Sequence, residues 1–215
     1  MELIMPSILI FILEIIGAVS FAVSGAMTAL RHRMDVFGVA ILGLVTAVGG
    51  GVIRDLILGV TPPATFRHPV YAIVALSVSV VIFMPSVRRL LMKKQKIYDA
   101  VLLLMDSVGL GIFTVVGIRA AWEATDSVNV FLFIFVGVTT GVGGGVRREV
   151  LAGDTPYIFV KHFYATASVI GAIICICVRI LFGDTPAIIA GAAATVLLRI
   201  LAAHFKWSLP HSSDS

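Results

Sequence analysis

Seven stretches of about 20 mostly apolar residues run along this sequence, and they limit the folds that it can adopt. Backbone groups that face lipid have no water to bond, so open sheet edges cannot lie there, and the stretches are too long for barrel strands. The chain is therefore expected to be an all-α membrane protein with seven transmembrane helices. The expected spans are residues 7–30, 35–58, 69–87, 98–118, 128–151, 162–182 and 185–204.

Charge supports a membrane location and indicates an orientation. Only 13% of the residues are charged, whereas soluble domains carry roughly 25%. The net charge of +4 could suggest nucleic-acid binding, but the basic residues lie in the gaps between the apolar stretches. Twelve of the 16 lysines and arginines fall on the side opposite the N-terminus. Because cytoplasmic loops are enriched in basic residues, the N-terminus is expected outside and the C-terminus in the cytoplasm. No nucleic acid is expected as a partner.

A motif near the end of the second stretch returns near the end of the fifth. Gly49–Pro62 reads GGGVIRDLILGVTP, and Gly143–Pro156 reads GGGVRREVLAGDTP. Upstream, Glu14–Gly17 corresponds to Asp106–Gly109. Each copy holds three spans, so the second must enter the bilayer from the opposite face, which gives two inverted repeats and a separate seventh helix. The expected divisions are 1–91 and 92–183 for the repeats, 184–206 for the seventh helix and 207–215 for a disordered cytoplasmic tail.

Each copy of the motif begins with three consecutive glycines inside an apolar stretch. Such a run removes side chains from all sides of a helix and makes its backbone easy to distort. We therefore expect the second and fifth spans to kink or break there, with Thr46 and Thr140 bonding freed carbonyls or lining a polar path. The alternative is that the glycines serve close helix packing. The residues concerned are Gly49, Gly50, Gly51, Gly143, Gly144 and Gly145.

Ionisable side chains lie inside the apolar stretches or near their ends. A charge at the bilayer centre costs upward of about 2.5 kcal/mol, so such groups usually face a partner or water. Adjacent residues do not face each other on a helix, so Arg54 and Asp55 are predicted to be poor partners and to reach other helices. Arg54 and Arg148 could instead snorkel to the membrane interface. The six residues are Glu14, Arg54, Asp55, Asp106, Arg148 and Glu149.

Hydroxyl groups in the first and fourth spans could replace part of an ion's hydration shell, or they could simply permit close packing. These residues are Ser20, Ser24, Ser107 and Thr114. In the seventh span, Ala187, Gly191 and Thr195 form a stripe of small residues that is predicted to pack against another helix.

Nothing in the sequence indicates an enzyme, because neither a metal-ligand cluster nor a nucleophile–base pair is recognisable. We therefore expect no resident metal and no cofactor, and no obligatory protein partner is evident. The basic segment Arg88–Lys96 is most simply an orientation signal, although bound anionic lipid is plausible there.

The doubled GGGxxR[DE] motif, with an acidic-x-x-Gly helix before each copy, resembles the trimeric intracellular cation channel (TRIC) family. Its prokaryotic members are also described as glycine-transporter-like domains. The resemblance runs from about Glu14 to Ala203. It implies a homotrimer in the prokaryotic inner membrane, with a potassium-permeable pore in each protomer lined by the first, second, fourth and fifth spans. The chain departs from the family pattern in two places: Glu14 replaces the usual aspartate, and Arg147-Arg148-Glu149 replaces the commoner x-Arg-Asp in the second motif, which adds positive charge.

Two other functions remain open at this point. Inverted repeats also suit alternating access, so a secondary transporter for a small zwitterion such as glycine is the main alternative. A scaffold that transports nothing is the third. A channel would pass potassium or sodium without a substrate, whereas a transporter would show saturable flux coupled to an ion gradient.

Overall fold

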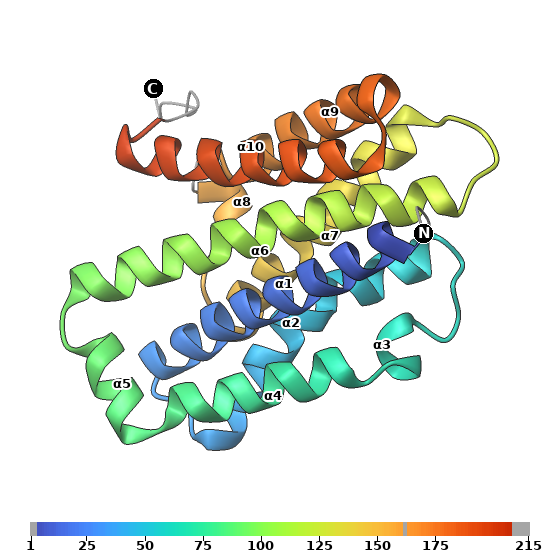
Figure 1. The fold of residues 1–215 in the computed structure, drawn as a ribbon. Helices are drawn as coiled ribbons and strands as arrows, with labels where there is room; N and C mark the ends of the chain where they lie inside the picture. The colour runs from blue at the N-terminus through green and yellow to red at the C-terminus, as the bar shows by residue number, and fades with distance from the viewer. Residues whose placement is uncertain (1–3, 161–162, 208–215) are drawn as a thin grey trace, which may run out of the picture.

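The structure is a computed structural model, and it describes residues 4–160 and 163–207. The expected tail, residues 207–215, lies outside the described residues apart from Trp207. The described part consists of helices joined by short loops (Figure 1). The helices are α1 (Ile4–Arg31), α2 (Val36–Ile57), α3 (Ala64–Arg67), α4 (Val70–Phe83), α5 (Pro85–Met92), α6 (Gln95–Glu123), α7 (Val130–Ala152), α8 (Tyr157–Val160), α9 (Tyr164–Phe182) and α10 (Asp184–His204).

Six of these helices are long and apolar enough to cross a membrane: α1, α2, α6, α7, α9 and α10. The predicted span at residues 69–87 differs, because it is divided into α4 and α5, which meet at a bend of 75°. Pro85 begins α5 and cannot donate the hydrogen bond that would continue α4. With 14 residues, α4 is about 21 Å long, shorter than the roughly 30 Å hydrocarbon core. Within the described residues, the number of candidate spans rises to seven when α4 and α5 are counted together.

Local sequence signals set several helix ends. The side chain of Asp35 accepts a hydrogen bond from the Gly38 amide at the start of α2. Asn129 accepts one from the Leu132 amide at the start of α7. At the end of α7, Gly153 takes a left-handed conformation with φ of 78°, which suits a residue without a Cβ atom.

The helices form a bundle in which the two halves of the chain make matching contacts. Within the first half, α1, α2 and α4 contact one another; within the second, α6, α7 and α9 do the same. Helices α1 and α6 lie side by side and run in opposite directions (Figure 1). The other large contact between the halves joins α2 to α7, while α10 packs on α9 and α6.

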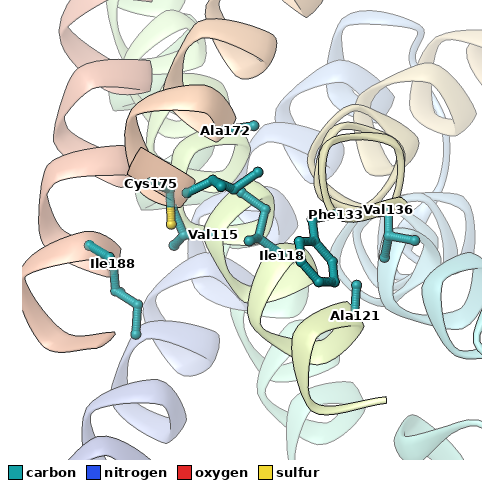
Figure 2. Packing of buried hydrophobic residues seen from close by; sticks show 10 residues of the cluster. Val115, Ile118, Ala121, Phe133, Val136, Ala172, Cys175 and Ile188 are labelled. Carbon is teal, nitrogen blue, oxygen red and sulfur yellow. The ribbon is translucent and has the colours of Figure 1, made fainter. Parts of the chain in front are cut away.

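Helix α6 is the centre of the bundle, with 72% of its most apolar window buried. Figure 2 shows one of the apolar clusters around it, where Val115 and Ile118 of α6 lie near Phe133 of α7 and Cys175 of α9. The small-residue stripe of α10 packs as predicted. Gly191 and Thr195 lie so close to Gly171 of α9 that a Cβ atom at Gly171 would collide with them.

Candidate functional site

A cluster built around three charged residues joins α1, α2, α3 and α4 on the side of the bundle where α1 begins, here called the N-terminal side. Arg54 Nε donates a hydrogen bond to Asp55 Oδ1 at 2.8 Å, and Arg54 Nη1 lies 3.8 Å from Glu14 Oε1. The Tyr71 hydroxyl donates to Glu14 Oε2 at 2.5 Å. The backbone amide of Ala64, the first residue of α3, donates to Asp55 Oδ2 at 2.7 Å. This N-terminal cluster therefore joins four helices.

A second cluster occupies the corresponding place in the other half of the chain. Arg148 of α7 donates hydrogen bonds to Asp106 at 2.7 Å and to Glu149 at 2.5 Å. Tyr164 of α9 donates to Asp106 at 3.4 Å, and the backbone amide of Tyr157, the first residue of α8, donates to Glu149 at 2.6 Å. Each of these contacts has its counterpart in the first cluster, although the counterpart of the Arg148–Asp106 hydrogen bond is the looser Arg54–Glu14 ion pair at 3.8 Å. Because α6 begins and α7 ends on the side rich in lysine and arginine, we call this the basic-side cluster.

The hydrogen bonds in both clusters contradict the prediction that adjacent charged residues on a helix are poor partners. Arg54 and Asp55 were predicted to be poor partners, yet they form a hydrogen bond, as do Arg148 and Glu149. The arginine side chain is long enough to place its guanidinium beside the carboxylate of the next residue on the same helix. The neighbouring carboxylate is held there because its second oxygen accepts a backbone amide from the next short helix. The prediction of partners on other helices is also correct, since Arg148 reaches Asp106 and Ser24 as well.

The two clusters differ in their exposure. The side chains of Arg148 and Asp106 are each 1% exposed, whereas those of Arg54 and Glu14 are 11% and 20% exposed. The ring of Tyr157 lies over the Arg148 guanidinium at 5.4 Å. Burial raises the pKa of the Tyr157 phenol, so it stays neutral. The basic-side cluster is therefore sealed, while the N-terminal cluster is accessible.

Two cavities border the N-terminal cluster. The first has a volume of about 150 Å³, and its polar lining includes Glu14, Arg54, Thr65, His68 and Tyr71. The second, of about 250 Å³, also has Glu14 and Arg54 in its wall, together with Arg119 and Glu123. Glu14 and Arg54 thus face both cavities. An ion or small polar molecule that entered either one would meet a carboxylate and a guanidinium.

The glycine triplets lie where α2 crosses α7, and both helices run through them without a break. The expectation of broken helices is therefore wrong, and a smaller bend stays a prediction. A Cβ atom at Gly50 would collide with the carbonyl oxygen of Thr140, and one at Gly144 with that of Thr46. The absence of side chains lets the two backbones touch. Close packing, the alternative reading of the glycines, explains these two positions.

The other glycines of the triplets have different surroundings. A Cβ atom at Gly145 would meet the Tyr164 hydroxyl at 2.5 Å, so this glycine makes room for the basic-side cluster. Its counterpart Gly51 lines the 150 Å³ cavity. A Cβ atom at Gly51 would have the Arg54 side chain at 3.9 Å and no closer contact outside its chain neighbours and the nearby backbone of its own helix. Gly143 faces Gly50 and Ile53 at ordinary contact distances.

Thr46 and Thr140 bond carbonyls of their own helices rather than freed ones. The Thr46 hydroxyl donates to the Leu42 carbonyl, and that of Thr140 donates to the Val136 carbonyl, each at 2.6 Å. Both helices continue through these positions, and each threonine bonds the carbonyl four residues before it.

The remaining predicted residues are buried hydroxyls. Thr114 bonds Ser168 of α9 at 2.7 Å, Ser107 donates to the Leu103 carbonyl, and Ser24 accepts from Arg148. Ser20 is also buried. None of the four predicted hydroxyl residues is in the lining of the two cavities beside Glu14.

Four residues of this region were not predicted from the sequence. Tyr71 and Tyr164 complete the clusters, and both follow the Thr-Pro pair of the repeated motif by a similar number of residues, which is a usable signal. Arg147 donates a hydrogen bond of 2.6 Å to the Gly49 carbonyl across the α2–α7 crossing. Arg199 of α10 is buried, and its guanidinium lies 4.8 Å from the centre of the Tyr164 ring.

Within residues 4–160 and 163–207, His, Cys, Asp and Glu form no group of three or more that could hold a metal ion. The carboxylates of both clusters are instead engaged by arginine, tyrosine and backbone amides. The chemistry of the site is therefore that of charge and hydrogen bonding.

Comparisons with known proteins cover nearly the whole chain. A family model described as Glycine transporter matches residues 11–86 and 103–179. The UPF0126 inner membrane protein YadS of Escherichia coli is 36% identical over 205 residues, which is 94% of this chain and 95% of that protein. The UPF0126 membrane protein YvgT of Bacillus subtilis is 34% identical over 94% of this chain and 96% of that protein.

Solved structures also match nearly the whole chain. A structure described as the basis for conductance through TRIC cation channels matches with a TM-score of 0.83 and 38% identity, over 95% of this chain and 97% of that one. The TRIC trimeric intracellular cation channel orthologue from Rhodobacter sphaeroides matches with a TM-score of 0.83 and 34% identity, over 93% of this chain and 99% of that one.

Proposed function

The chain belongs to the TRIC family, which is also described as the glycine transporter family, and on this premise we propose that it is a channel for monovalent cations. One observation carries the proposal: the chain matches a solved TRIC cation channel at 38% sequence identity and a TM-score of 0.83 over 95% of its length. Potassium is the proposed permeant ion, and sodium is the alternative. The solved neighbours are channels, and none of them is described as an enzyme.

The proposed pore runs inside the protomer, among α1, α2, α6 and α7. These helices make the large contacts between the two halves, and they hold all six charged residues of the clusters. The N-terminal cluster lies near one end of this path and the basic-side cluster near the other. A cation would therefore meet two matched sets of carboxylates, with the glycine crossing between them, and the sealed basic-side cluster would have to open for it to pass.

Glu14 is the residue that we propose to attract cations on the N-terminal side. The N-terminal cluster has two carboxylates and one guanidinium, and Arg54 forms its hydrogen bond with Asp55 rather than with Glu14. Glu14 Oε1 is therefore only loosely neutralised while it faces two cavities. Carboxylates in such a position raise the local concentration of cations.

The glycine crossing would keep the middle of the path narrow and free of bulky side chains. Gly50 and Gly144 allow α2 and α7 to approach until backbone meets backbone. The backbone carbonyls and the buried hydroxyls of Ser20, Ser24, Ser107 and Thr114 would then supply oxygen atoms that replace part of the hydration shell. A bend at the glycines would widen or close this region.

We propose a homotrimer that lies in the bacterial inner membrane. The Rhodobacter sphaeroides relative is described as a trimeric channel, and the Escherichia coli relative is named an inner membrane protein. Exposed apolar side chains such as Phe37, Phe131 and Leu181 give the bundle a surface suited to lipid or to neighbouring protomers. The excess of basic residues on one side supports the proposal that the C-terminus lies in the cytoplasm.

A second candidate function is transport of a small zwitterion such as glycine. The observation that favours it is the 3.8 Å separation of Arg54 and Glu14 beside a cavity of about 150 Å³. A guanidinium and a carboxylate in one wall could bind the carboxylate and the ammonium of an amino acid. The alternative requires saturable uptake that depends on an ion gradient.

Planar bilayer recording tests the two candidates directly. Purified protein is reconstituted with asymmetric potassium chloride, and the reversal potential is measured with and without glycine. Discrete steps that reverse near the potassium potential and ignore glycine support the channel. Silent bilayers from folded trimeric protein, together with glycine uptake into proteoliposomes, would replace the channel by the transporter.

A further inference from the structure

A separate cavity lies at the basic side of the first half of the chain. Its volume is about 410 Å³, and its wall contains Arg33, Arg88 and Arg89 over an apolar floor that includes Met34, Phe83 and Met92. Arg33 belongs to the turn between α1 and α2, and the other two arginines belong to α5. We call this the arginine cavity.

The bend between α4 and α5 shapes this cavity. Because α5 turns away from α4 by 75°, it carries Arg88 and Arg89 beside the α1–α2 turn instead of continuing along the bundle. Figure 1 shows α5 linking the ends of α4 and α6 at one end of the bundle. Apolar residues of this region, such as Met84 and Leu90, are exposed, as expected for a helix at a membrane interface.

The charges of the arginine cavity are not balanced by acidic residues. Its lining contains no Asp or Glu, and within the described part of the chain no carboxylate pairs with any of the three arginines. Arginines elsewhere behave differently: Arg119 pairs with Glu123, and Arg179 pairs with Asp184. The guanidinium of Arg88 lies over the Phe83 ring, 5.6 Å from its centre.

We propose that the arginine cavity binds the phosphate of an anionic phospholipid headgroup. An orientation signal needs basic residues on one side of the membrane, but it does not need them to converge on one cavity. Guanidinium groups match phosphate oxygens well, and the apolar floor suits the glycerol esters and the first carbons of the acyl chains. The position beside exposed apolar residues favours a lipid over a soluble phosphate. This inference is independent of the proposed conduction.

Lipid binding by the purified protein tests the proposal. Affinity for dioleoylphosphatidylglycerol and for dioleoylphosphatidylcholine is measured in detergent by native mass spectrometry and by the lipid-induced shift in Tm. The cavity variant carries Arg33→Gln, Arg88→Gln and Arg89→Gln. The control variant carries Lys93→Gln, Lys94→Gln and Lys96→Gln, which removes the same charge from the same side without touching the cavity lining.

The expected result is selective binding of phosphatidylglycerol by the wild-type protein and by the control variant. Each surface arginine contributes roughly fivefold to the affinity for an anionic headgroup, so the cavity variant should bind about a hundredfold more weakly. If the triple variant does not fold, Arg88→Gln alone should lose about fivefold. An equal loss in the control variant overturns the proposal, as does a wild-type protein that does not prefer phosphatidylglycerol. Inorganic phosphate that reproduces the Tm shift at equal concentration overturns the lipid assignment.

Discussion

Arg148 of α7 donates a hydrogen bond of 2.7 Å to Asp106 of α6, and both side chains are 1% exposed. Replacing Arg148 with Gln would leave the carboxylates of Asp106 and Glu149 buried without their counter-charge. We expect this change to lower the free energy of unfolding by about 3–5 kcal/mol, as for other broken buried pairs. Chemical unfolding in mixed micelles measures the effect.

The matched control for that change is Arg54→Gln in the N-terminal cluster. Its partner Glu14 lines both cavities, so water can solvate that carboxylate once the guanidinium is gone, whereas its other partner, Asp55, is only 5% exposed. The cost should be less than half of that for Arg148→Gln. Equal costs at the two sites would contradict the view that only the basic-side cluster is sealed.

Alanine substitutions separate the glycines that pack from those that do not. Gly50→Ala would drive a Cβ atom into the Thr140 carbonyl, and we expect a loss of about 2–3 kcal/mol. A Cβ atom at position 51 has space, and Gly51→Ala removes the flexibility of glycine from the unfolded chain. This change should therefore raise the free energy of unfolding by about 0.5–1 kcal/mol. Thermal unfolding of the two variants gives the comparison. If both were equally destabilising, the triplet would have a role beyond helix contact.

Glu14→Gln tests the proposed entrance for cations. Removing this charge should reduce single-channel conductance by about two- to fivefold and bring the reversal potential closer to zero, because the local cation concentration falls. Asp126→Asn is the control, since Asp126 is exposed on the same side and lines neither cavity. An equal effect of both changes would assign the result to general surface charge. The effect of Glu14→Gln should also weaken at high salt.

Arg147 tests the middle of the proposed path. The corresponding residue of the first motif is Ile53, so Arg147→Ile makes the two sides of the glycine crossing alike. This change removes a guanidinium that is bonded to the Gly49 carbonyl. We expect potassium conductance to rise by about two- to fivefold, because less positive charge opposes the ion. Arg147→Lys keeps the charge and should leave conductance nearly unchanged. If Arg147→Ile has no effect, Arg147 lies away from the path.

Much of the fold follows from patterns that a bilayer enforces. Apolar stretches of sufficient length define α1, α2, α6, α7, α9 and α10 within a few residues, because lipid leaves few other options. The repeated motif also identified the six charged residues that meet in the two clusters. The bend at Met84 was missed, although Pro85 lay inside the predicted span and proline disfavours a continuous helix.

The contacts within the clusters were harder to predict. The angle between neighbouring positions on a helix describes where Cβ atoms point, but the arginine head group lies several bonds further out. Whether Arg54 turns to Asp55 or to Glu14 depends on which carboxylate oxygens are already engaged. The Ala64 and Tyr157 amides that engage them come from helices of only four residues, which are too short to show a helical period in the sequence. Sequence also does not indicate which cluster is exposed to a cavity.

The connection between α9 and α10 has a consequence for the synthesis of the protein. Gly183 alone separates the two helices, with φ of 85°, and Arg179 pairs with Asp184 across the turn at 2.9 Å. Because the link is one residue long, α10 can only run antiparallel to α9. We therefore expect the two helices to insert into the bilayer as one hairpin, with the direction of α10 fixed by that of α9.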